Sequence, residues 1–83
     1  MYLVFGAEMA EKYGATVSEK LAGKTISKRK ADDGKLGSLR YEAEKLNIDG
    51  FDMWTLLETL EGMCAVGLAT EIDDSHYRVN ATK

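Results

Sequence analysis

The chain contains no proline, one cysteine and one histidine in 83 residues. A single cysteine excludes an internal disulfide, which fits a protein of a reducing compartment. No apolar run approaches the roughly 20 residues that a membrane-spanning helix needs. Met1 to Phe5 is apolar, but this segment has no basic leader and is too short for a secretory signal peptide. We therefore expect a cytoplasmic protein that has no membrane partner.

The residue types that carry catalysis or bind metals are few and lie far apart. Cys64 and His76 match neither the spacing of zinc ligands nor that of a cysteine–histidine nucleophilic pair. Residues 23–25 (Gly-Lys-Thr) are similar to the end of a phosphate-binding loop, but Ser18 stands where that motif has a glycine. Residues 47–50 (Asn-Ile-Asp-Gly) lack the further acids of a calcium loop. The sequence predicts no catalytic residue, no metal, no cofactor and no small-molecule substrate, and hence no enzyme.

Basic residues are missing from a long part of the chain. Residues 1–45 carry nine Lys or Arg against seven Asp or Glu, a net charge of +2, whereas residues 46–83 carry two against seven, a net charge of −5. Between Asn47 and Tyr77 there is no Lys or Arg at all. The C-terminal half is therefore the acidic half of a chain whose total net charge is −3.

The length and the apolar content predict one small globular domain over residues 1–83. The hydrophobic share is 45%, which is ordinary for a globular protein. A chain of this length buries only about two-thirds of the surface that its unfolded form exposes. Self-association would be one way to add buried surface.

The strongest local signals surround one helix in the acidic half. Asp52 is a good N-cap, because its side chain can accept hydrogen bonds from the first helical turn. Phe51 and Leu56 stand at the two positions of a hydrophobic staple. Gly67 is a natural C-terminal stop, since glycine adopts the left-handed conformation at little cost. The sequence predicts a helix from Met53 to Val66.

This helix has one apolar side and one polar side. Helical spacing groups the apolar residues Met53, Leu56, Leu57, Leu60, Met63 and Cys64. The residues Thr55, Glu58, Gly62 and Ala65 project away from that stripe, with Glu61 on its flank. Trp54 lies off the centre of the stripe, where it either packs under the N-terminal segment or is an exposed anchor of the kind that dominates protein interfaces.

After Gly67 the pattern changes from helical to alternating. Leu68, Thr70 and Ile72 would face one way, with Ala69 and Glu71 on the other side. Residues 73–75 (Asp-Asp-Ser) have the composition of a turn. Beyond the turn, Tyr77 and Val79 alternate with His76 and Arg78. This pattern predicts a two-stranded hairpin from Leu68 to Val79.

The region before residue 24 leaves alternatives open. Met1 to Tyr13 fits either a short strand over Tyr2 to Phe5 followed by a helix, or a single helix that ends at Gly14.

Residues 16–19 (Thr-Val-Ser-Glu) have the form of a capping box. They predict a helix that begins at Val17 and places Val17 and Leu21 on one face. This helix either ends at Gly23 or continues toward Arg29.

A further helix is predicted from Leu39 to Leu46. Ser38 is its candidate N-cap, and Leu39, Ala43 and Leu46 fall on one face at i, i+4 and i+7. Before it lies a basic segment that is either a solvated loop or an edge that contacts phosphates. Its cations are Lys24, Lys28, Arg29, Lys30 and Lys35, followed by Arg40 on the helix.

The order of helix, short turn, helix and hairpin resembles the winged-helix version of the helix-turn-helix fold. The match is carried by residues 56–61 (Leu-Leu-Glu-Thr-Leu-Glu), 67–72 (Gly-Leu-Ala-Thr-Glu-Ile) and 76–79 (His-Tyr-Arg-Val), and it covers about residues 36–79. The resemblance implies an α+β fold with a small three-helix core and a C-terminal β-hairpin wing. It also implies DNA binding, with the helix 53–66 in the major groove.

The charges of this helix depart from that pattern. It offers Thr55, Glu58, Thr59 and Glu61, and the wing adds Asp73 and Asp74. Carboxylates are repelled by phosphates, and DNA binding depends on cations that release counterions.

Two functional hypotheses follow. In the first, the chain is a regulatory module that binds a protein partner, or itself, through an acidic helix–wing face made of Trp54, Thr55, Glu58, Glu61, Asp73 and Asp74. In the second, it is a DNA-binding regulator that contacts phosphates through the basic segment: Lys24, Lys28, Arg29, Lys30, Lys35 and Arg40.

Overall fold

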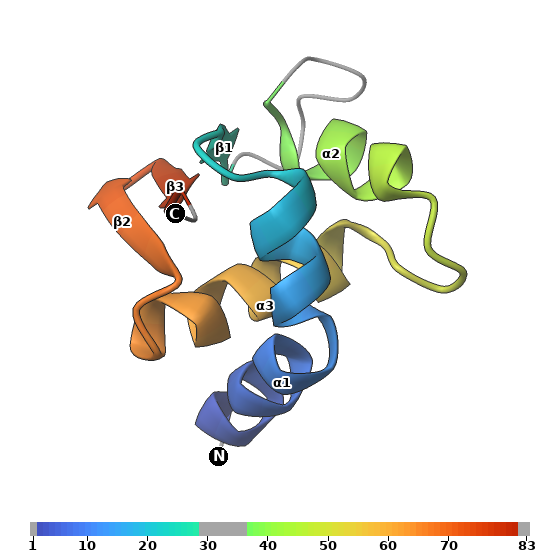
Figure 1. Cartoon of the computed structure of the whole chain (residues 1–83), viewed down its shortest axis with the longest axis horizontal. Coiled ribbons are helices and arrows are strands. Elements are labelled where there is room, and N and C mark those ends of the chain that lie inside the picture. The colour runs from blue at the N-terminus through green and yellow to red at the C-terminus, as the bar shows by residue number, and fades with distance from the viewer. Residues whose placement is uncertain (1, 29–36, 82–83) are drawn as a thin grey trace.

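The computed structural model describes the backbone of residues 2–28 and 37–81 and the side chains of residues 8–28 and 37–81. The described chain is a small α+β fold of three helices and three strands (Figure 1). In chain order the elements are α1 (Tyr2–Lys20), β1 (Thr25–Ser27), α2 (Leu39–Leu46), α3 (Met53–Ala65), β2 (Ala69–Asp73) and β3 (His76–Val79). The predicted helix pair and C-terminal hairpin are confirmed.

The three strands form one antiparallel sheet in the order β1-β3-β2. Tyr77 in the central strand stands opposite Ile26 of β1 and Glu71 of β2. Strand β1 was not predicted, because its three residues are too few to show an alternating pattern. Pairing with β3 makes this segment a strand, so the expectation that a helix continues toward Arg29 is wrong.

Helix α1 is longer and more regular than its sequence indicates. It runs for 19 residues without a break, so a strand over Tyr2 to Phe5, a helix end at Gly14 and a helix start at Val17 are all wrong. The predicted shared face is present, because Val17 and Leu21 are both buried with Ala10. The packing of α1 against α3 is the most extensive between any two elements of the described chain, and it outweighs the local signals for a break.

Helices α2 and α3 begin where their caps predict. The Ser38 hydroxyl accepts from the backbone N–H of Tyr41 at 3.1 Å, and a carboxylate oxygen of Asp52 accepts from the N–H of Thr55 at 2.9 Å. Phe51, at the predicted staple position, is buried in the core.

The end of α3 is a Schellman motif at Gly67. The N–H of Gly67 donates to the carbonyl of Cys64 at 3.3 Å, and the N–H of Leu68 donates to the carbonyl of Met63 at 2.8 Å. Gly67 has a φ of 86°, a left-handed conformation that L side chains rarely adopt. The predicted glycine stop is therefore confirmed.

The core lies between the three helices and the sheet. Leu56, Leu60 and Met63 of the predicted stripe are fully buried. Gly62 is also buried, so its predicted outward position is wrong, because packing covers a wider sector of α3 than the apolar stripe. Tyr77 and Val79 are buried, whereas His76 is only partly buried and Arg78 is exposed, so the predicted alternation of β3 is confirmed.

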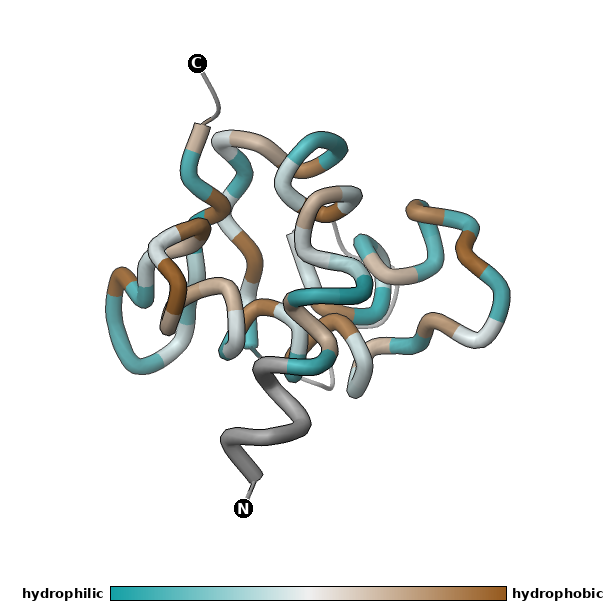
Figure 2. The backbone as a smooth tube through the Cα atoms, turned by 60° about the horizontal axis from the view of Figure 1, so that its bottom comes forward, coloured by the Kyte–Doolittle hydropathy of each residue, from teal (hydrophilic) through white to brown (hydrophobic). Residues whose placement is uncertain are grey.

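Burial does not alternate along β2 as the sequence predicts, because Ala69 is buried and the four residues after it, including Glu71, are exposed. Leu68 and Ile72 stay 38% and 46% exposed. In Figure 2, hydrophilic and hydrophobic residues follow one another at short intervals along the described chain. None of the helices in the described ranges combines the length and apolar character needed to span a bilayer.

Candidate interaction surface

One line of residues on α3 faces solvent along the length of the helix. Trp54, Glu58, Glu61 and Ala65 recur at i, i+4, i+7 and i+11, which places them on one side of an α-helix. Trp54 is 50% exposed, Glu61 and Ala65 are exposed, and Glu58 is partly exposed. These four residues are called the α3 ridge. Trp54 is half exposed and is not among the buried core residues, so it is not fully covered by the rest of the chain.

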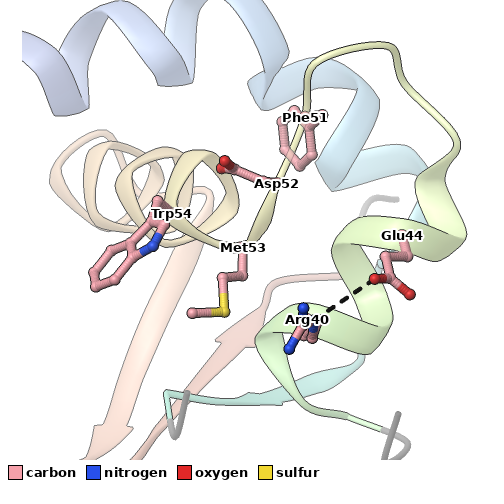
Figure 3. Close-up of a pocket in the computed structure, with 6 residues that line it drawn as sticks. All are labelled: Arg40, Glu44, Phe51, Asp52, Met53 and Trp54. Atoms are coloured by element: carbon pink, nitrogen blue, oxygen red, sulfur yellow. Dashed lines mark ion pairs between the residues drawn. The ribbon is translucent and has the colours of Figure 1, made fainter. Parts of the chain in front are cut away.

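A pocket of about 320 Å³ lies beside the ridge, between α2 and the first turn of α3. Its lining residues are Arg40, Glu44, Phe51, Asp52, Met53 and Trp54. Figure 3 shows Met53 extending from α3 into the space toward Arg40 on α2, with Trp54 on the outer side of α3. We call this pocket the α2–α3 trough. The trough was not predicted from the sequence, because it forms only where α2 and the start of α3 lie side by side.

Apolar side chains and charged side chains have separate places in the trough. Phe51 is buried and packs edge-on against Tyr13, with ring centroids 4.8 Å apart, so its position is fixed by the core. Arg40 and Glu44 form an ion pair along α2, with Nε and Oε2 3.7 Å apart. The trough therefore has an apolar floor and a charged rim.

Asp52 at the rim is an ionised carboxylate. The hydrogen bond from the Thr55 backbone N–H, together with one from the Thr55 hydroxyl, holds the pKa of Asp52 below its usual value. Thr55, expected at the interaction surface, thus serves the helix cap with its hydroxyl group.

The other end of the ridge lies beside the sheet. Lys28 Nζ donates to a carboxylate oxygen of Glu71 and lies 4.5 Å from the ring centroid of Tyr77. Burial raises the pKa of Tyr77 to about 12, and Glu61 and Glu71 both add to this effect. Glu61 of α3 and Glu71 of β2 therefore act on the same group. Glu71 was absent from the predicted face.

Cys64 stands next to this cluster and is a poor nucleophile. Partial burial raises the pKa of its thiol, and the nearby Glu71 raises it further. A thiol reacts mainly as its thiolate, so this environment suppresses reactivity, in line with the interpretation of Cys64 as a small apolar residue. Across the described ranges, no three His, Cys, Asp or Glu side chains gather closely enough to hold a metal ion.

The two acids predicted at the wing tip lie in the turn between β2 and β3. Asp73 accepts a hydrogen bond from the Ser75 N–H at 2.7 Å and lies 3.1 Å from Nδ1 of His76. The bond from Ser75 lowers the pKa of Asp73. Figure 1 shows β2 beginning beside the end of α3 and running away from it. Asp73 and the exposed Asp74 are therefore a second acidic group, separate from the ridge.

Two of the three described cations of the basic segment face carboxylates. Lys28 is bound to Glu71 and Arg40 pairs with Glu44, while Lys24 lines a small pocket beside Glu42. The other three predicted phosphate contacts, Arg29, Lys30 and Lys35, lie outside the described residues.

Glu42 is a buried acid that the sequence analysis did not single out. It is 1% exposed, and one of its carboxylate oxygens accepts from the Gly37 N–H at 3.1 Å. Its burial could have been found from the sequence of α2. Glu42 lies three residues after Leu39 and four before Leu46, which places it on the same helix face as both. Glu42 ties the chain that enters α2 to the helix.

A wider groove of about 750 Å³ lies along α1 beside Leu68. Small and acidic side chains of α1 and of the turn after it line the groove: Ala10, Glu11, Ala15, Ser18, Glu19 and Ala22.

Comparisons of the chain with models of protein families, with curated proteins and with solved structures found no match.

Proposed function

We propose that this chain is a small non-enzymatic interaction module that binds a basic partner protein through the α3 ridge. The observation that carries the proposal is the chemistry of that ridge. It offers an aromatic residue and two carboxylates, and no Lys or Arg occurs between Asn47 and Tyr77. A surface of this kind favours a cationic partner and repels anions.

The arrangement of elements supports a winged-helix-like module. The chain order of helices and strands and the sheet order β1-β3-β2 are compatible with a helix pair followed by a β-hairpin wing. In such a module α3 occupies the position of the recognition helix. Here that position presents Glu58 and Glu61, so the ligand that we propose is a protein. The role that we propose for the chain is regulatory.

Trp54 is the residue most suited to anchor a partner. A large aromatic side chain that is 50% exposed leaves apolar surface in contact with water. Covering that surface is favourable, and tryptophan is enriched among the residues that contribute most to binding. The flanking carboxylates would then set the charge preference of the interface.

DNA binding through the basic segment is the second candidate. The winged-helix-like order of elements favours it. The carboxylate partners of Lys28 and Arg40 oppose it, because a cation that is already paired gains less from a phosphate. This candidate predicts binding to arbitrary duplex DNA that weakens steeply as salt rises.

One experiment separates the two candidates. The full chain is titrated at two salt concentrations with a lysine-rich peptide, a glutamate-rich peptide and an arbitrary DNA duplex. We expect binding of the lysine-rich peptide only. The double variant Glu58→Lys, Glu61→Lys should weaken this binding at least tenfold, whereas Glu11→Lys, Glu19→Lys makes the same charge change on α1 and should not. Binding of the duplex alone would reject the proposal.

A further inference from the structure

We infer that the partner is a basic helix that inserts one apolar side chain into the α2–α3 trough while its cations face Glu58 and Glu61. This inference rests on the proposed function and specifies the occupant of the same surface. It joins two features that lie side by side, the trough and the ridge, and Trp54 belongs to both.

The size and lining of the trough suit a single side chain. Its volume is about 320 Å³, at the low end of the range of about 300–1,000 Å³ for small-molecule pockets. Met53, which is partly exposed, and Trp54, which is half exposed, supply most of the accessible apolar surface. Phe51 is held in the core by Tyr13, so part of the floor is formed before binding and an apolar side chain would enter a prepared site.

The rim charges favour a cationic neighbour for that side chain. Arg40 and Glu44 form an ion pair on α2, and their charges largely cancel. The carboxylate of Asp52, whose pKa is lowered by its Thr55 hydrogen bonds, leaves the lining with one net negative charge. A partner that carries Lys or Arg next to its apolar residue is therefore attracted, and one that carries Asp or Glu is repelled.

The ridge presents its groups at intervals that a helical partner can match. Trp54, Glu58, Glu61 and Ala65 are separated by four, three and four residues, which places them in line along one side of α3. At about 1.5 Å of rise per residue, Glu58 and Glu61 lie about 6 Å and about 10 Å from Trp54 along the helix axis. A partner helix that places its apolar residue in the trough would meet them with cations four and seven residues away.

The test uses designed peptides and the protein's own fluorescence. Trp54 is the sole tryptophan, so its emission reports on the trough. The probes are alanine-based helical peptides with leucine as the anchor and lysine four and seven residues away, made in both chain directions. Two control peptides replace the leucine by serine, or both lysines by glutamate.

We expect the leucine–lysine peptide to shift Trp54 emission to shorter wavelength with saturation. The serine peptide should bind at least tenfold more weakly, and the glutamate peptide should not bind. The variant Trp54→Ala lacks the fluorescent residue, so its peptide binding is measured by calorimetry. It should bind the leucine and serine peptides equally, which would assign the preference for leucine to the trough. In Glu58→Gln, Glu61→Gln, all lysine peptides should weaken while the preference for leucine remains.

The outcomes separate failure of this inference from failure of the proposed function. Equal binding of the leucine and serine peptides to the unchanged protein, with binding still dependent on Glu58 and Glu61, would overturn the inference alone. Absence of binding by every lysine peptide would overturn both. A shift of Trp54 emission caused by an arbitrary duplex, or by raising the protein concentration without peptide, would name DNA or a second copy of the chain as the occupant and reject the basic helix.

Discussion

Helices α1 and α3 pack against each other, yet their boundaries have different physical origins. Helix α3 begins at the Asp52 cap and ends at the Gly67 Schellman motif, so hydrogen bonds within a few residues define both ends. Helix α1 passes through Gly14 and Thr16 without a break. Its regularity follows from the surface that it buries against α3. One helix is bounded by local bonds and the other is held by tertiary packing.

The largest effect is expected where the packing of the two helices is weakened. Leu60 on α3 is fully buried, and Leu60→Ala should lower the free energy of unfolding by about 2–5 kcal/mol, because it leaves a cavity in the core. That is a large part of the roughly 4–12 kcal/mol expected for a domain of this length. Urea unfolding measures it. The matched variant Trp54→Ala, on the exposed side of α3, should cost less than half as much, and an equal loss would contradict the assignment of the two faces.

The C-terminal end of α3 tests the local contribution next. At Gly67, φ is 86° and an added Cβ meets no atom within 4 Å. Gly67→Ala should therefore cost about 1–2 kcal/mol through backbone strain alone. Gly67→Asn should recover part of this loss, since asparagine tolerates the left-handed region better. Equal stability of Gly67→Ala and the unchanged protein in urea would show that the Schellman motif is dispensable.

The same contrast explains which features of the fold follow from the sequence. The caps at Ser38, Asp52 and Gly67 depend on neighbouring residues, and all three were predicted. Strand β1 and the unbroken α1 depend on residues far along the chain, and neither was. The three residues of β1 form a strand because β3 lies beside them, and no local pattern carries that information.

The candidate surface divides along the same line. Helical spacing alone places Glu58 and Glu61 on the outer side of α3, so the ridge was predicted in outline. The trough requires Arg40 to lie near Met53, and the ion pair beside Tyr77 requires Lys28 to reach Glu71, 43 positions later. Pairs so distant in sequence give no periodic signal, and the tertiary fold alone brings them together.

The N-terminal end of α3 should show a smaller effect that depends on pH. Asp52→Ala removes the cap and should cost about 1 kcal/mol at neutral pH, whereas Asp49→Ala, an exposed acid in the preceding turn, should cost little.

Because hydrogen bonds from Thr55 lower the pKa of Asp52 in the folded protein, the stabilisation is present above the unfolded value of about 3.9 and is lost as the pH falls through the folded value. We therefore expect the free energies of unfolding of Asp52→Ala and of the unchanged protein, measured in urea between pH 2 and pH 7, to become equal in acid. A constant difference over that range would mean that the carboxylate charge has no part in the cap.

The smallest expected effect is a gain of stability in α1. Glycine inside a helix costs roughly 0.5–1 kcal/mol relative to alanine, because it loses more backbone entropy on folding. A Cβ at Gly14 would lie 3.7 Å from Met63 Cγ and 3.8 Å from Leu68 Cδ1, which are ordinary contact distances. Gly14→Ala should therefore raise the free energy of unfolding by about 0.5–1 kcal/mol. The reverse change at an exposed neighbour, Ala15→Gly, should lower it by a similar amount. If Gly14→Ala were destabilising in urea while Ala15→Gly behaved as expected, α1 would have to lie closer to α3 than these distances allow.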